Sequence, residues 1–126
     1  MPLTFRPRHR LTHARQFAAV YARKCRAARG PLVVFGARND LPHSRLGLSV
    51  ARRVGTAPRR NRVKRLIRES FRLAQFDLPL VEGAGIDLVV SVHPHEALEQ
   101  REYQDLLREL VATIAARLAR AAREGA

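Results

Sequence analysis

The stretch from Arg59 to Glu69 constrains the fold of this chain more than any other segment. No glycine or proline lies between Arg59 and Leu78, so the sequence predicts a helix of about four turns from Arg59 to near Gln75. At ~100° per residue, apolar and basic side chains separate onto opposite faces. The apolar face holds Val63, Leu66, Ile67, Ser70, Phe71 and Ala74, and the opposite face holds Asn61, Lys64, Arg65, Arg68 and Arg72.

This one-sided basic face weakens the helix that carries it. Cations three or four residues apart repel by a few tenths of a kcal/mol per pair, and the helix dipole disfavours cations in the first turn. Glu69, four residues after Arg65, is the only acid in the stretch and the only one placed to relieve this repulsion. A solvated surface face is the simplest interpretation, but the near absence of acids favours a polyanion that docks along the helix.

The charge of the whole chain points to the same kind of partner. The chain has 126 residues, a net charge of +13 and a sequence pI of about 11.7. Residues 1–72 contain 19 Lys and Arg against two acids, whereas residues 73–126 contain five against nine. Such asymmetry is typical of a domain that presents one face to a polyanion. Arginine is also the side chain that binds phosphate through two parallel hydrogen bonds.

Length and cysteine content indicate one cytoplasmic domain. A chain of 126 residues suits one core, so we expect a single RNA-binding domain over residues 1–126. Cys25 is the only cysteine, which excludes an internal disulfide and favours a reducing compartment. No apolar run is long enough to cross a membrane and the N-terminus lacks a signal-peptide core, so we expect no membrane partner.

The first half of the chain predicts an arm, a helix and two strands. Residues 1–10 are basic and contain two prolines, which favours an extended arm. Thr12 is a candidate N-cap for a helix over residues 13–24, which carries Phe17 and Tyr21 one turn apart. Residues 26–31 are predicted to form a loop, and strands are predicted over residues 32–37 and 45–51. The second strand has a small face of Gly47, Ser49 and Ala51 that allows a bulky group to approach closely.

The second half completes an α+β fold. We expect a third strand over residues 86–92 and a long helix over residues 97–123. The element order is then α-β-β-α-β-α, which is typical of a small α/β sandwich with helices packed on a sheet. The basic helix lies between two strands, so it can serve as a crossover between neighbouring parallel strands.

The sequence offers little chemistry for cutting RNA. His93 and His95, followed by Glu96, form the only metal-like pair, and no third ligand lies at a recognisable spacing. The basic half contains only Asp40 and Glu69, whereas a two-metal nuclease needs several carboxylates facing the phosphate. We therefore expect a chain that binds RNA and has no metal site or catalytic residues of its own.

Three parts of the sequence resemble one family. The stretch Arg60–Glu69 closely resembles the signature of the bacterial ribonuclease P protein component. Residues 45–53 resemble the strand that leads into that signature, and Phe17, Tyr21 and Phe35 resemble aromatic positions of the family. The similarity runs from about residue 11 to residue 118. The family commonly has two lysines where this chain has Arg52 and Arg53, so a planar bidentate group replaces a point charge.

The resemblance implies a subunit of an enzyme whose catalyst is RNA. In this family an RNA subunit with bound magnesium removes the 5′ leader of precursor tRNA, and the protein assists. The strand–helix–strand crossover that contains the basic helix is left-handed in the family, whereas almost all such crossovers between parallel strands are right-handed. The residues expected to bind ribonuclease P RNA are Arg60, Asn61, Arg62, Lys64, Arg65, Arg68 and Arg72, and those expected to bind the leader are Phe17, Tyr21, Phe35, Arg52 and Arg53.

Three alternatives stay open at this point. A structural RNA-binding protein of the ribosomal kind would share the charge but bury the three aromatic side chains. An autonomous nuclease would use His93, His95 and Glu96 and would cut without an RNA subunit. A helix–turn–helix DNA-binding protein is disfavoured because two strands immediately precede the basic helix. No obligate protein partner is inferred.

Overall fold

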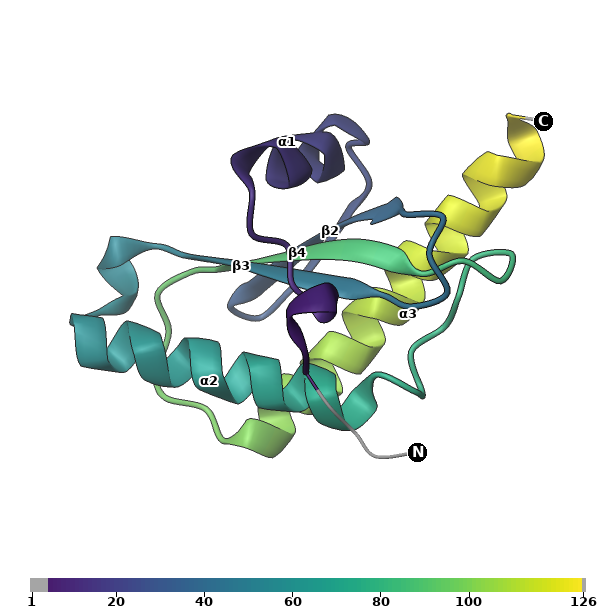
Figure 1. Cartoon of the computed structure of the whole chain (residues 1–126). Coiled ribbons are helices and arrows are strands. Elements are labelled where there is room, and N and C mark those ends of the chain that lie inside the picture. The colour runs from purple at the N-terminus through teal and green to yellow at the C-terminus, as the bar shows by residue number, and fades with distance from the viewer. Residues whose placement is uncertain (1–4, 126) are drawn as a thin grey trace.

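A four-stranded sheet lies between helices on both faces in the computed structural model, which describes residues 5–125 (Figure 1). Helices α2 and α3 cover one face, and α1 lies on the other. This arrangement confirms the predicted α+β class. The elements are η1 (Pro7–His9), α1 (Ala14–Ala22), β1 (Arg26–Arg29), β2 (Leu32–Arg38), β3 (Arg45–Val50), η2 (Arg52–Val54), α2 (Ala57–Ala74), β4 (Ile86–Val92) and α3 (Gln100–Glu124).

The strands follow the order β1-β2-β4-β3. β2 runs antiparallel to β4, with Val34 opposite Val90, and β3 runs parallel to β4, with Leu48 opposite Val90. Helix α2 therefore connects two neighbouring parallel strands, as predicted. The left hand of this crossover stays a prediction.

The prediction of a loop over residues 26–31 was wrong. Residues Arg26–Arg29 form β1, which pairs antiparallel with β2 through the two-residue turn Gly30–Pro31. The four-residue sequence has no apolar alternation that would mark it as a strand. Its pairing with β2 and its packing against α3 make it one, and Arg117 of α3 donates a hydrogen bond to the Arg26 carbonyl.

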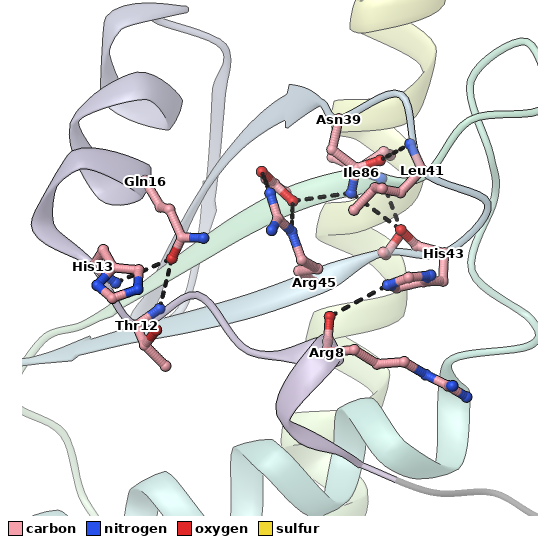
Figure 2. A network of polar contacts seen from close by, with 11 residues as sticks. Arg8, Thr12, His13, Gln16, Asn39, Leu41, His43, Arg45 and Ile86 are labelled. Carbon is pink, nitrogen blue, oxygen red and sulfur yellow. Dashed lines mark hydrogen bonds and ion pairs between the residues drawn. The ribbon is translucent and has the colours of Figure 1, made fainter.

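The helices begin or end a few residues away from the predicted positions, and local hydrogen bonds explain several of these differences. α2 begins at Ala57 because the Thr56 hydroxyl accepts a hydrogen bond from the Arg59 N–H (3.4 Å) and Pro58 is tolerated in the first turn. His13, and not Thr12, is the N-cap residue of α1, which ends earlier than predicted at Ala22. The Gln16 side chain accepts hydrogen bonds from the backbone N–H groups of both Thr12 and His13 (Figure 2). α3 starts three residues later than predicted, at Gln100.

The predicted extended arm is also wrong for the part that the structure describes; residues 1–4 lie outside it. Residues Pro7–His9 form a 3-10 turn, and His9 is only 5% exposed. Leu11 then donates a backbone hydrogen bond to the Leu46 carbonyl (3.0 Å), next to a bridge between Arg10 and Leu46. The segment thus passes around the β3 edge of the sheet, from the α2 side to the α1 side (Figure 1).

Each face of the sheet has its own apolar core. Between the sheet and α2 and α3 lies the larger cluster, which includes Val34, Leu88, Phe71 and Ile114, each fully buried. Under α1 lies a small cluster of Leu11, Val20, Ala37 and Val89. No helix within residues 5–125 has both the length and the apolar character needed to cross a membrane.

Candidate nucleic-acid interface

Helix α2 buries one face and presents a row of basic side chains on the other, as its periodicity predicted. Val63, Ile67 and Phe71 are at most 5% exposed and pack toward the sheet and α3. The opposite side chains are exposed or half-buried, and we refer to them as the basic strip. The basic strip consists of Arg60, Asn61, Arg62, Lys64, Arg65, Arg68 and Arg72.

Acids neutralise little of the basic strip. Glu69 was expected to reduce the repulsion between Arg65 and its basic neighbours. Its carboxylate instead pairs with Arg72, at 2.9 Å from Arg72 Nε. The other cations of the strip form no ion pair with any acid among residues 5–125. Burial and the nearby Arg10 lower the pKa of the Arg68 guanidinium. The strip is therefore a concentrated positive surface that a polyanion would stabilise.

Phe17, Tyr21 and Phe35 come together on the α1 side of the sheet, and we refer to them as the aromatic cluster. Tyr21 of α1 contacts Phe35 of β2 edge to face, with ring centroids 4.9 Å apart and an interplanar angle of 83°. Phe35 is half-buried, and Tyr21 is 39% exposed. Exposed aromatic faces of this kind can stack on unpaired bases.

Phe17 has a structural role although it is partly exposed. Its ring packs against the apolar cluster under α1 and lies directly over Gly47 of β3. A Cβ atom at position 47 would lie 2.6 Å from Phe17 Cζ, closer than real contacts allow. The predicted small face of this strand is therefore occupied by the Phe17 ring, which is half-buried.

Arg26 lies beside the aromatic cluster, whereas Arg52 and Arg53 lie in η2 at the end of β3. Arg52 and Arg53 are exposed in η2, which joins the end of β3 to α2, and neither forms an ion pair within residues 5–125. Sequence reasoning missed Arg26, whose guanidinium carbon lies 5.9 Å from the centre of the Phe35 ring. No local pattern marks Arg26; the register of β1 on β2 places it opposite Phe35.

Among the candidate metal and nuclease residues, His95 has a structural role. His95 uses both ring nitrogens: Nδ1 lies 2.8 Å from the His93 carbonyl and Nε2 lies 2.6 Å from the Tyr103 hydroxyl. The His93 carbonyl can only accept, so the His95 Nδ1–H donates to it, and Nε2 shares the second hydrogen bond with the Tyr103 hydroxyl. In the described part of the chain, no three His, Cys, Asp or Glu side chains are placed to hold a metal ion. Burial raises the pKa of the Cys25 thiol, which disfavours a nucleophilic thiolate.

The most buried carboxylate on the α1 side of the sheet is also engaged. Asp87 of β4 accepts two hydrogen bonds from Arg45 of β3, at 2.8 and 2.7 Å, and a third from the Asn39 amide at 2.9 Å (Figure 2). The Asn39 side chain also bonds the Leu41 N–H and the His43 carbonyl. This network holds the β2–β3 connection in place and leaves Asp87 poorly suited to act as a general base.

Known proteins share both the sequence and the fold of this chain. Residues 5–117 match the sequence model of the Ribonuclease P family. The chain is 43% identical over 110 residues to the ribonuclease P protein component of Escherichia coli O139:H28, covering 86% of this chain and 88% of that protein. The same component of Cronobacter sakazakii is 38% identical over 109 residues, with the same coverage of 86% and 88%.

Solved structures agree. The RNase P protein from Thermotoga maritima superposes with a TM-score of 0.63 at 31% identity, covering 86% of this chain and 96% of that one. The Staphylococcus aureus RNase P protein superposes with a TM-score of 0.70 at 27% identity, covering 82% and 93%. The basic strip and the aromatic cluster lie within the matched residues. The chain therefore belongs to the bacterial ribonuclease P protein component family.

Proposed function

We propose that this protein binds the catalytic RNA of ribonuclease P through the basic strip and the 5′ leader of precursor tRNA through the aromatic cluster. In this role it assists the endonucleolytic removal of the leader that produces the mature 5′ end of tRNA. The observation that carries the proposal is the presence, in one small fold, of two RNA-compatible surfaces of different chemistry. We place this activity in the cytoplasm, where the single Cys25 stays reduced.

The basic strip suits a folded RNA. Its cations project from one side of a rigid helix of 18 residues and can follow a phosphate backbone. Within residues 5–125 only Arg72 among them pairs with an acid, so binding would release counterions from the RNA without breaking many protein ion pairs. Asn61, which is exposed beside Arg62 and Arg65, can contact ribose or base edges.

The aromatic cluster suits an unpaired strand. Tyr21 is exposed and Phe35 is partly so, and Arg26 supplies a cation beside the Phe35 ring. We assign the exposed Arg52 and Arg53 at the end of β3 to the same leader surface. Stacking combined with cations binds single strands with little base preference, as a protein that serves many leaders requires. A structural RNA-binding protein of the ribosomal kind would have these rings buried, so the exposure of Tyr21 favours the leader surface.

We assign catalysis to the RNA subunit. The carboxylates and histidines of the described chain do not converge on a metal site, and His95 and Asp87 are engaged in structural hydrogen bonds. The carboxylates and histidines of the described residues thus do not fit a metal ion bound by the protein itself. We assign the magnesium ions of the reaction mainly to the RNA. The protein's part is to bind and position the two RNA molecules.

Cleavage of a 5′-labelled precursor tRNA tests the proposal. The substrate is incubated in magnesium with the protein alone, with ribonuclease P RNA alone and with both. We expect no cleavage with the protein alone, and faster cleavage at the mature 5′ end when both are present at low magnesium than with the RNA alone. Cleavage by the protein alone, or no effect of the protein on the RNA, would contradict the assignment.

A further inference from the structure

A recess lies beside the start of the basic strip. It has a volume of about 300 Å³ and is formed between the first turns of α2 and the irregular segment that precedes α3. Most of its lining is apolar: Pro58, Val63 and Leu66 from α2, and Ala97, Leu98 and Tyr103 from the opposite wall. We refer to it as the α2–α3 pocket.

Polar contacts at one side keep the two walls of the pocket together. Arg59 Nη2 donates a hydrogen bond to the His95 carbonyl, and the Tyr103 hydroxyl bonds the His95 ring at 2.6 Å. The Arg59 side chain lies over Gly55, where a Cβ atom would approach Arg59 Cδ to 2.4 Å, so any larger residue at position 55 would displace it. Residues 93–99 thus form a defined wall although they contain no regular secondary structure.

Arg59 also has an unused hydrogen-bond donor. Its Nε–H is the one buried side-chain polar atom within residues 5–125 that lacks a partner. Buried donors without acceptors are rare, and each one calls for an explanation. Arg59 lines the pocket, so a ligand with an acceptor group could bond this donor once the side chain turns its Nε–H toward the cavity.

We propose that the α2–α3 pocket takes an unstacked nucleobase of the ribonuclease P RNA. A base has apolar faces that suit the Leu66 and Leu98 walls, and edge oxygen or nitrogen acceptors that suit the Arg59 donor. Arg62 is exposed, lines the pocket and belongs to the basic strip, so it can hold an RNA phosphate beside the pocket whether or not the base is seated.

The charge around the pocket selects this occupant over others. The pocket borders the basic strip, and this positive surface disfavours a second copy of a chain whose net charge is +13. An apolar peptide side chain would leave the Arg59 donor unsatisfied. This inference rests on the proposed binding of the RNA subunit along the basic strip, and adds to it a contact that phosphate binding alone does not supply.

Filling the pocket tests the inference. Ala97 is exposed and lines the pocket, so Ala97→Trp, with Ala97→Leu as a smaller filler, would occupy it without opening the core. Ala116→Trp is the matched control, because Ala116 is exposed on α3, 13 residues beyond Tyr103 and thus ~20 Å along the helix. Affinity of the full chain for the ribonuclease P RNA is measured at several salt concentrations, together with the melting temperature of each variant.

We expect Ala97→Trp to weaken RNA binding about tenfold, the size of one lost base contact, and to leave the salt slope unchanged. Ala116→Trp should bind like the wild type, and Arg65→Ala should lower the salt slope. If Ala97→Trp and Ala116→Trp bind alike while Arg65→Ala is weakened, the pocket inference fails and the proposed function stands.

A lower salt slope for Ala97→Trp would indicate a phosphate contact instead of a base, and would overturn the inference. The inference would also be overturned if the wild type sediments as a dimer and Ala97→Trp as a monomer, because the occupant of the pocket would then be a second copy of the chain. If Arg65→Ala and Ala97→Trp both bind the RNA like the wild type, both the pocket inference and the proposed function fail.

Discussion

The basic strip and the aromatic cluster are built in opposite ways. All side chains of the basic strip come from one helix, and the residues that hold this helix in place lie on its other face. The aromatic cluster combines α1 and β2, and its members also pack against the sheet. Charge can therefore change on the strip with little effect on the fold, whereas in the cluster binding and stability are coupled through Phe17.

The largest effect should come from the buried face of α2. Phe71 is 0% exposed and contacts the Phe5 ring edge to face, with centroids 5.6 Å apart. Phe71→Ala should lower the free energy of unfolding by about 3–5 kcal/mol, the usual loss for a buried phenylalanine. Urea unfolding measures this loss. A decrease below ~1 kcal/mol would show that α2 is not held through this face.

Phe17→Ala should affect stability and leader binding together. Removing a half-buried ring that packs over Gly47 should lower the free energy of unfolding by about 1–3 kcal/mol. Loss of the stacking edge should also weaken binding of precursor tRNA to the assembled enzyme. The two quantities are measured by urea unfolding and by equilibrium binding. Loss of stability alone would mean that Phe17 belongs only to the core.

Tyr21→Ala should separate these two effects, because Tyr21 is 39% exposed. We expect a loss of about 1–3 kcal/mol in precursor tRNA affinity, the cost of one stacked base. Stability should change little. Mature tRNA, which has no leader, is the control ligand and should bind the holoenzyme as before. Equal losses for both ligands would refute a leader surface at the aromatic cluster.

Arg65→Ala should act only on binding of the RNA subunit. The side chain is exposed and makes no ion pair within residues 5–125, so unfolding should be unaffected. The slope of log affinity against log salt concentration should fall by somewhat less than one unit, about 0.9 for one duplex phosphate contact. Arg68→Ala should behave similarly, whereas Arg120→Ala, an exposed arginine near the end of α3, is the control. A large drop in melting temperature with unchanged affinity would show that the strip is structural.

The smallest expected effect concerns Glu69. Its hydrogen bond with Arg72 lowers the pKa of the Glu69 carboxyl below its usual value. A carboxyl whose pKa is lower in the folded state stabilises the fold above its unfolded pKa, and this contribution is lost as the pH falls through the folded pKa. Both groups are partly exposed, so the contribution is small and weakens with salt.

Stability measured at pH 7 and pH 3 checks this prediction for the wild type and Glu69→Gln. The wild type should lose slightly more stability than the variant on acidification, and the difference should shrink at high salt. An identical pH dependence of the two proteins would mean that the pair contributes nothing.

The sequence determined the features that depend on neighbouring residues. The period of apolar side chains in α2 and the alternation in β2, β3 and β4 specify which faces are buried, because each pattern has the repeat of its own element. The basic strip followed directly, since side chains opposite Val63 and Ile67 must point away from the core. The long signature around Asn61 was sufficient to indicate the family.

Only the tertiary structure decided the features that join distant segments. β1 exists because it pairs with β2 and packs under α3, and that pairing brings Arg26 over Phe35. Arg65 and Arg72 each lie about one helical turn from Glu69, and the hydrogen bonds of Glu69 connect it to Arg72 and not to Arg65. The α2–α3 pocket and the double role of Phe17 depend on contacts between elements far apart in the chain, and no local pattern of residues records such contacts.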